Sequence, residues 1–317
     1  MKKFLTTFIF FILFILISGE IIVRVFKLTP DIPHMYVDKT GIQRYIPGQS
    51  GYFADSKIQW HVNQYGWLGI ADVKSDSTIA IIGDSYIENM MNPISCNQGT
   101  ILQSYFKDYA FFEAGRSGVT FIEAMEITKL LDSTVKPLTH LIYMTDDDIY
   151  ESDASHRLYD RMQLNLKTNT IINGEVKAPG FKKILYNMKV MYYLYLRFPL
   201  FVNKKNKEAS QGGKKPKKID VKLINSILSY SSKHYDLRKI VLVFHPESTV
   251  ELLTIARNYG FSTMTTHQTG DLKNWTVSSK DSHWSCYGHN EVALQIKAQL
   301  TAYIKNNEAK SKIALNR

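Results

Sequence analysis

Five short apolar runs alternate with helical patterns along this chain, and this alternation limits the possible fold more than any other feature. The runs predict strands at residues 78–83, 109–113, 140–145, 239–245 and 261–266, and the patterns predict helices at 99–107, 121–131, 221–234, 249–259 and 291–304. Parallel strands joined through helices need crossover connections, which leave helices on both faces of the sheet. We therefore predict an α/β chain, a flavodoxin-like three-layer α/β/α sandwich whose parallel sheet has about five strands.

The first apolar run ends in Gly83-Asp84-Ser85, which places a hydroxyl where the predicted strand stops. In an open α/β sheet, ligands bind outside the carboxyl ends of the strands. Near the other end of the chain, Asp281-Ser282-His283-Trp284 supplies a histidine and a carboxylate. A serine hydroxyl is a weak nucleophile that needs a base to take its proton and a third group to orient that base. Ser85, His283 and Asp281 are therefore the predicted catalytic residues.

These motifs resemble the conserved blocks of the SGNH/GDSL hydrolase superfamily. Gly83-Asp84-Ser85 is similar to the block that carries the nucleophile, and Ala114-Gly115-Arg116-Ser117-Gly118 is similar to the second block. Asp281-Ser282-His283-Trp284 has the Asp-x-His-Trp form of bacterial exopolysaccharide acetylation proteins, and Asn63-Gln64-Tyr65-Gly66-Trp67 resembles a segment of membrane-anchored members. The resemblance implies the same three-layer fold, with an oxyanion hole that includes the backbone N–H groups of Ser85 and Gly118.

The third block departs from the family pattern. After the predicted strand at 140–145 the family usually has Asn-Asp, whereas this chain has Asp146-Asp147-Asp148-Ile149. The simplest alignment puts Asp147 where the resemblance expects the asparagine of the oxyanion hole. An ionised carboxylate there would repel the oxyanion, and one lost donor typically costs roughly a hundredfold to a thousandfold in rate. Three alternatives stay open: Asp147 is protonated, it faces away from the hole, or Arg116 or Tyr86 donates instead.

Met1-Lys2-Lys3 precedes an uncharged and strongly apolar stretch at residues 4–19. As a helix this stretch would be about 24 Å long. Apolar residues resume beyond Glu20 as far as Phe26 and complete a span of roughly 30 Å. We predict an uncleaved anchor at residues 1–27, a single pass through the cytoplasmic (inner) membrane with the rest of the chain on the extracytoplasmic side. A cleaved signal peptide is the alternative, and it exports the same residues.

Residues 28–75 contain several prolines and glycines, which predict an irregular lead-in before a main domain at residues 76–310. Residues 151–218 interrupt the alternation of strands and helices. Within them, Asn173-Gly174 between apolar residues predicts a hairpin turn, and residues 181–200 are dense in Tyr, Met, Leu and Arg. Because this insertion leaves the carboxyl edge of the third strand, we interpret it either as a cap over the substrate groove or as a packing element on the flank of the domain.

Much of the net charge of +10 is concentrated in one segment. Two lysine-rich runs at residues 204–207 and 214–218 flank Gly212-Gly213, which predicts a solvated, flexible linker. The sequence has no zinc-ligand spacing, P-loop or nucleic-acid motif, so we expect no cofactor, no metal and no nucleic-acid partner. Cys96 and Cys286 are the only cysteines, and they either form a disulfide in an exported chain or remain two free thiols.

Five further side chains are candidates for substrate binding, packing or backbone capping. We interpret Trp284 and His245 as substrate contacts: Trp284, like Trp67, could stack on a sugar face, and His245 follows the fourth predicted strand. A purely structural role is the alternative for each. His289 lies near the start of the last helix, where packing or capping is the commoner role. Asp84 is expected to bond the backbone near it.

Together with the resemblance, these residues predict a serine esterase or O-acyltransferase that acts on acyl esters of an extracytoplasmic glycan, acetyl esters by the resemblance. Hydrolysis and transfer share an acyl-enzyme and differ in whether water or a sugar hydroxyl attacks it. The expected partners are an acylated glycan or acyl donor, the cytoplasmic membrane, and a membrane acyltransferase or export component. The alternative is a non-catalytic SGNH-like module that binds glycan or scaffolds an export complex, which Asp147 motivates.

Overall fold

A five-stranded parallel sheet lies at the centre of the computed structural model, which describes residues 2–53, 58–176, 179–198 and 220–315. Its strands are β5 (Thr78–Gly83), β6 (Ala110–Gly115), β7 (Thr139–Met144), β10 (Ile240–Phe244) and β11 (Ser262–Thr265). They lie in the order β6-β5-β7-β10-β11, and each neighbouring pair is parallel. This order is the flavodoxin-like one, so the predicted fold class is confirmed.

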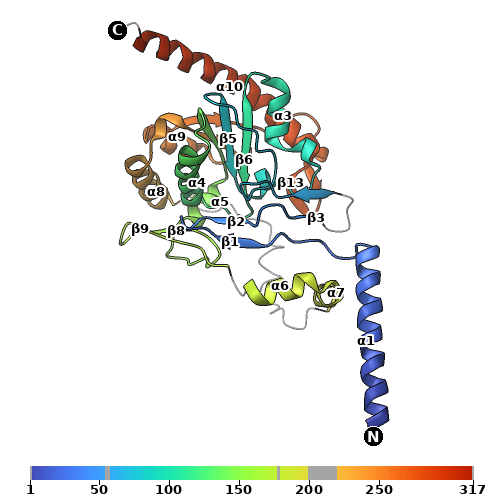
Figure 1. Ribbon diagram of the computed structural model, residues 1–317. Coiled ribbons are helices and arrows are strands. Elements are labelled where there is room, and N and C mark those ends of the chain that lie inside the picture. The colour runs from blue at the N-terminus through green and yellow to red at the C-terminus, as the bar shows by residue number, and fades with distance from the viewer. Residues whose placement is uncertain (1, 54–57, 177–178, 199–219, 316–317) are drawn as a thin grey trace.

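Alternate residues of each strand point to two separate cores, one on each face of the sheet. In β5, Ala80 and Ile82 belong to one core, and Ile79 and Ile81 belong to the other. The first core is covered by α4 (Phe121–Thr134), α8 (Val221–His234) and α9 (Val250–Asn258), and the second by α3 (Gln98–Tyr105) and α10 (Cys286–Leu315). These layers are visible in Figure 1. Because both faces are covered, β5, β6, β7 and β10 are buried at every residue and are largely apolar in the sequence, whereas β11 at the edge is only partly buried.

Polar residues start the covering helices close to where the sequence patterns begin. Thr120, Asp220 and Thr249 each accept a hydrogen bond from a backbone N–H in the first turn of α4, α8 and α9. α8 spans the predicted residues 221–234. α10 begins at Cys286 rather than at residue 291, because Ser285 Oγ accepts hydrogen bonds from the backbone N–H groups of the next turn.

Residues 28–75, expected to be irregular, contain two antiparallel pairs of short strands. β1 (Met35–Val37) pairs with β2 (Gln43–Tyr45), and β3 (Ser50–Tyr52) pairs with β4 (Gln59–His61). Pro30 and Pro33 precede β1, and Pro47 lies between β2 and β3, so none of these prolines is within a strand. Leu68 and Ala71 then bridge to β6, so the lead-in covers the outer edge of the sheet.

The insertion after β7 has two parts. In the first, β8 (Gln163–Asn165) and β9 (Thr170–Ile172) form a hairpin whose turn lies at residues 166–169 and not at the predicted Asn173-Gly174. The side chain of Asn165 accepts from the backbone of this turn, and Asn169 has a left-handed φ of 53°. The second part consists of α6 (Pro179–Asn187) and α7 (Lys189–Arg197). The predicted linker around Gly212-Gly213 lies outside the described residues.

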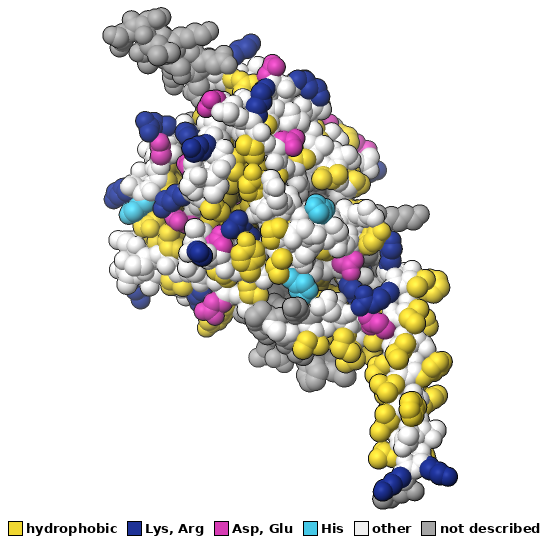
Figure 2. All heavy atoms as spheres, in the orientation of Figure 1, with side chains coloured by type: hydrophobic (Ala, Val, Ile, Leu, Met, Phe, Trp, Pro, Cys, Tyr) yellow, Lys and Arg dark blue, Asp and Glu magenta, His cyan; other side chains and the backbone are white. Residues whose placement is uncertain are grey.

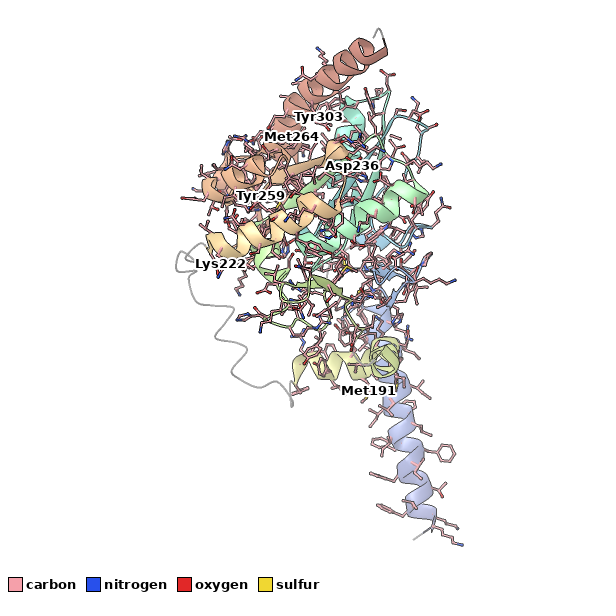
Figure 3. The ribbon with its side chains drawn as sticks, turned by 90° about the vertical axis from the view of Figure 1, so that its left-hand side faces the viewer. Met191, Lys222, Asp236, Tyr259, Met264 and Tyr303 are labelled. Carbon is pink, nitrogen blue, oxygen red and sulfur yellow. A yellow bond between two sulfur atoms is a disulfide. The ribbon has the colours of Figure 1, made fainter. Side chains whose placement is uncertain are left out.

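α1 (Lys2–Val25) is long and apolar enough to cross a membrane, with a mean hydropathy of 2.5. Figures 1 and 2 show it extending away from the domain with its apolar side chains on the surface. Figure 3 labels Met191 in the first turn of α7, beside the part of α1 that is nearer the domain. The predicted N-terminal apolar helix is therefore present.

Candidate active site

Ser85 opens α2 (Ser85–Glu88) directly after β5, at the carboxyl edge of the sheet. Its Oγ lies 2.8 Å from His283 Nε2, and His283 Nδ1 lies 2.6 Å from Asp281 Oδ1. His283 and Asp281 belong to β13 (Asp281–Trp284), which pairs with β12 (Thr276–Ser278). The structure thus brings the three predicted catalytic residues together in the order of a serine triad.

Two glycines allow α2 to lie directly against the sheet. A Cβ on Gly83 would lie 2.5 Å from Ile87 Cγ1, and a Cβ on Gly115 would lie 2.5 Å from the backbone nitrogen of Glu88. Any larger residue at Gly115 would therefore push α2, and Ser85 with it, away from β6.

An aromatic cluster lies against the imidazole of His283. The ring centroid of Tyr86 is 5.1 Å from that of His283 and 4.8 Å from that of Trp284, and the ring of His245 stacks on Trp284. Trp284 is only 3% exposed, and His245 and Trp67 are also buried. This burial favours the packing alternative for Trp284, because a buried ring leaves little of its face for a sugar to stack on. His245 and Trp284 also line a small pocket with Asp84 and Tyr86, so their role as substrate contacts stays a prediction.

The second block places Gly118 under a positive charge. Gly118 has a φ of +78°, a left-handed conformation that favours glycine. A Cβ at this position would lie 3.0 Å from Arg161 Nε and 3.2 Å from Arg161 Cζ, so the guanidinium covers Gly118. Arg116, the alternative oxyanion donor, is buried, and its Nη2 and Nη1 donate to Glu123 and to the Ser117 carbonyl, both at 2.7 Å.

The three aspartates of the third block lie in the first turn of α5 (Asp146–Glu151). Asp146 accepts a hydrogen bond of 3.1 Å from the backbone of Thr249, and Asp148 accepts one of 2.6 Å from the backbone of Thr145. Asp147 is half-buried between them. Its place in the oxyanion hole stays a prediction.

The carboxyl groups of Asp84, which directly precedes Ser85, and of Asp148 interact with each other at this edge of the sheet. Burial raises the pKa of Asp84 to about 6. Its side chain accepts a hydrogen bond of 3.0 Å from the Tyr86 backbone, as the sequence predicts, and this bond caps α2 and opposes the rise in pKa. Burial and the charge of Asp84 also raise the pKa of Asp148 well above its usual range. These carboxyl groups therefore hold a proton at pH values where an exposed aspartate has lost it.

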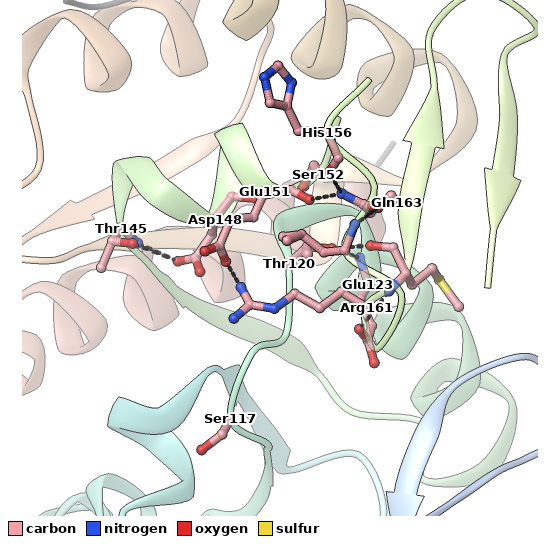
Figure 4. Close-up of polar contacts among 12 residues, drawn as sticks. Ser117, Thr120, Glu123, Thr145, Asp148, Glu151, Ser152, His156, Arg161 and Gln163 are labelled. Atoms are coloured by element: carbon pink, nitrogen blue, oxygen red, sulfur yellow. Dashed lines mark hydrogen bonds and ion pairs between the residues drawn. The ribbon is translucent and has the colours of Figure 1, made fainter. Parts of the chain in front are cut away.

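Arg161 is the site residue that sequence reasoning missed. It comes from the insertion, just before β8, and forms an ion pair with Glu151 of α5 (Figure 4). Burial lowers the pKa of Arg161, and the negative charges of Asp148 and Asp84 oppose this. The side chain thus places a positive charge over Gly118, between the second and third blocks. No motif marks it in the sequence, because the contact joins two distant segments.

No family model matches this sequence, and no curated protein matches it. Solved structures that are similar to this chain include an esterase, a lipase/acylhydrolase and GDSL-like lipases. A psychrotrophic esterase EstA from Pseudoalteromonas sp. is 12% identical, with a TM-score of 0.37 over 72% of this chain and 99% of its own. A GDSL-like lipase from Bacteroides thetaiotaomicron is 11% identical, with a TM-score of 0.33 over 75% of this chain and 92% of its own. A family 3 carbohydrate esterase from Clostridium thermocellum is 12% identical, with a TM-score of 0.34 over 69% of this chain and 92% of its own.

Cys96 and Cys286 form a disulfide with a Cα–Cα distance of 5.0 Å. Cys96 ends η1 (Ile94–Cys96), soon after α2, and Cys286 begins α10, directly after β13. The bond joins residues separated by 190 positions in the sequence and ties η1, which follows α2, to the start of α10, which follows β13. Of the two alternatives for the cysteines, the structure has the disulfide.

His289 lies behind the triad and is buried. Its Nδ1 lies 3.1 Å from Gln98 Nε2, and burial, with the charge of His283, lowers its pKa to about 3. It is therefore neutral at physiological pH and packs, as the sequence predicts. Among the described residues, no group of three or more His, Cys, Asp and Glu side chains is placed to hold a metal ion.

Proposed function

We propose that this protein is a serine esterase or O-acyltransferase. The observation that carries the proposal is the pair of hydrogen bonds from Ser85 through His283 to Asp281. An imidazole that is bonded to a hydroxyl on one side and to a carboxylate on the other is the arrangement that lets a serine lose its proton to a neighbouring base.

In the proposed reaction, Ser85 Oγ bonds to the carbonyl carbon of the ester while His283 Nε2 takes the hydroxyl proton. Asp281 holds the imidazole in the required tautomer and stabilises the imidazolium. His283 then gives the proton to the leaving oxygen, and the acyl group remains on Ser85. Water or a sugar hydroxyl attacks this acyl group and loses its own proton to His283, which releases either the free acid or a new ester.

The proposed donors to the oxyanion are the backbone N–H groups of Ser85 and Gly118. Arg161, whose guanidinium covers Gly118, adds a positive charge at this place. Charge of this sign stabilises the oxygen that becomes negative in the transition state. It also offsets the carboxylates at residues 146–148, which would otherwise oppose that negative charge.

We place this reaction on the extracytoplasmic side of the cytoplasmic membrane, with α1 as the anchor. The Cys96–Cys286 disulfide supports an oxidising compartment, because cytosolic thiols are kept reduced. The proposed substrate is an acylated glycan, with acetyl as the acyl group, and the proposed partner is a membrane acyltransferase or an export component. Substrate and partner rest on the resemblance of the sequence motifs.

Ester hydrolysis by the full-length protein in detergent tests the proposed chemistry. The protein should release para-nitrophenol from para-nitrophenyl acetate, and Ser85→Ala should abolish this release with an unchanged circular dichroism spectrum. Hydrolysis and transfer are separated by measuring the free acetate released from an acetylated polysaccharide with and without an acceptor glycan. A hydrolase releases free acetate in both cases, whereas a transferase moves the acetyl group to the acceptor. Equal activity of the wild type and Ser85→Ala would remove Ser85 from the mechanism, and a folded but inactive wild type would favour the non-catalytic glycan-binding module.

Membrane fractionation tests the proposed location. After a carbonate wash the protein should remain in the membrane pellet, and protease added from outside should digest the domain. A soluble exported product whose N-terminus is Glu20 would show instead that the apolar segment is a cleaved signal peptide.

A further inference from the structure

α6 and α7 carry apolar side chains that the described part of the domain leaves exposed. Met191 and Leu194 of α7 are exposed at a spacing of three residues, which puts them on one face of the helix, and the exposed Phe198 directly follows the helix. Ile184 of α6 and Met188, between the two helices, are exposed as well. Helices of about nine residues are marginal in water by themselves, so these two need a further surface to pack on.

α7 begins against the outer part of α1. Glu20 of α1 accepts hydrogen bonds from the backbone N–H groups of Lys189 and Val190, at 3.0 and 2.8 Å, and so caps α7 from another helix. A Cβ on Gly19 would lie 3.0 Å from Val190 Cγ2, so the two helices are also in close contact. On its other side, Lys189 Nζ lies 2.5 Å from Asp31, which ties α7 to the lead-in of the domain.

This contact lies where the uncharged stretch of α1 ends. Residues 4–19 separate Lys3 from Glu20, and as a helix they rise about 24 Å, most of the roughly 30 Å hydrocarbon core of a bilayer. Figures 1 and 3, which differ by a quarter turn, both show α6 and α7 lying across the direction of α1. If α1 spans the membrane, α6 and α7 lie along its outer surface.

We propose that residues 179–198 form an interfacial platform, which lies in the headgroup region of the membrane with Met191, Leu194 and Phe198 turned toward the lipid. The proposal rests on the anchoring of α1 in the proposed function. Tyr193, Tyr195 and Arg197 of α7 are residue types found at membrane interfaces. A single helix leaves the domain free to rotate, whereas a second attachment fixes how the sheet edge that carries Ser85 faces the membrane.

Quenching of tryptophan emission by brominated lipids tests the platform, because bromine on the acyl chains quenches only tryptophans close to them. The full-length protein is reconstituted into phosphatidylcholine vesicles with and without brominated acyl chains. All four native tryptophans are at most 7% exposed within the domain, and their emission gives the baseline. Leu194→Trp reports on the platform, and Phe11→Trp, in the apolar stretch of α1, reports separately on insertion of the anchor.

Leu138→Trp is the matched control. Leu138 is 44% exposed and Leu194 is 41% exposed, so both substitutions put a tryptophan at a similarly accessible leucine. Leu138 directly precedes β7, however, and therefore lies at the edge of the parallel sheet opposite the one that carries Ser85 and the insertion. Met191→Trp is a second reporter on the same face of α7, in case Leu194→Trp does not fold.

We expect Leu194→Trp to lose a larger share of its emission to brominated lipid than Leu138→Trp, with emission at shorter wavelength. Equal quenching of these two variants would overturn the platform. That result is also the one expected if a protein partner covers this face, because the vesicles contain no partner. If Phe11→Trp is quenched but Leu194→Trp is quenched no more than the control, the anchor is kept and the platform is rejected. If Phe11→Trp is not quenched, the anchor itself is rejected.

Discussion

The two sides of one sheet edge differ in how closely they follow the pattern of a serine hydrolase. On the β5 side, Ser85, His283 and Asp281 are joined by two short hydrogen bonds. On the β7 side, aspartates occupy the first turn of α5, and the nearby positive charge comes from Arg161 in the insertion. Proton transfer depends on one geometry, whereas stabilisation of a negative charge depends on a summed field that different residues can supply. Different residues can therefore supply the charge on the β7 side, whereas the β5 side requires these residue types in this geometry.

The largest effect is expected from a change on the β5 side. Asp281→Asn keeps the shape of the side chain but no longer holds His283 in the required tautomer, and kcat/KM for para-nitrophenyl acetate should fall by about 10⁴-fold. Asp236→Asn is the control, because Asp236 is an exposed aspartate that pairs with Arg238, and it should leave the rate unchanged. Nearly normal activity of Asp281→Asn would mean that the β5 side does not work as a triad.

A smaller loss is expected on the β7 side. Arg161→Met removes the charge over Gly118 but keeps an unbranched side chain, and it should lower kcat/KM by about 10- to 100-fold, less than the usual loss for a direct oxyanion donor. Arg161→Lys should recover part of this loss because it restores the charge. The melting temperature of each variant shows whether the fold is intact. Unchanged kcat/KM in a folded Arg161→Met would show that the reaction does not use this charge.

Asp147→Asn should change the rate in the opposite direction. It exchanges a negative charge for an amide donor of almost the same shape, so kcat/KM near neutral pH should rise several-fold. Asp146→Asn is the matched control, since its carboxylate accepts from the Thr249 backbone, and it should give no gain. A loss of activity in Asp147→Asn would mean that the carboxylate is needed and that the alignment of the third block is wrong.

The smallest effect concerns stability rather than rate. Burial raises the pKa of Asp84 from 3.8 to about 6, so its protonated form favours the folded state. This contribution is fully present below pH 3.8 and is lost as the pH rises through about 6. Asp84→Asn keeps an acceptor for the Tyr86 backbone without the charge, so its Tm should fall less than that of the wild type between about pH 4 and about pH 7. Thermal unfolding is measured by tryptophan fluorescence at each pH. If the Tm of the wild type and the Tm of Asp84→Asn change with pH by the same amount, this expectation is contradicted.

The sheet and the triad could be predicted from the sequence because both depend on local pattern. β5, β6, β7 and β10 are buried at every residue and are largely apolar, and β11 at the edge is only partly buried, yet the sequence pattern marks all five strands to within two residues. Ser85 stands where such a run ends, and parallel strands bring their carboxyl ends to one edge. His283 and Asp281 were predictable from their residue types and spacing.

Contacts between distant segments could not be predicted in this way. Arg161 reaches Gly118 only because the first part of the insertion folds back onto the second block. Trp284 is next to His283 in sequence, but its burial depends on Tyr86 and His245 from two other segments. Asn173-Gly174 is a stronger turn signal than the residues that make the turn, yet the pairing of β8 with β9 decides where the hairpin bends.

Covalent labelling of Ser85 by a fluorophosphonate tests the central claim most directly, because this reagent reacts with a serine only where a neighbouring base activates it. We predict a single adduct on the full-length protein in detergent, assigned to Ser85 by mass spectrometry and absent from a folded His283→Ala variant. A folded wild type without this adduct, or labelling that persists unchanged in His283→Ala, would contradict the assignment of Ser85 as a nucleophile activated by His283.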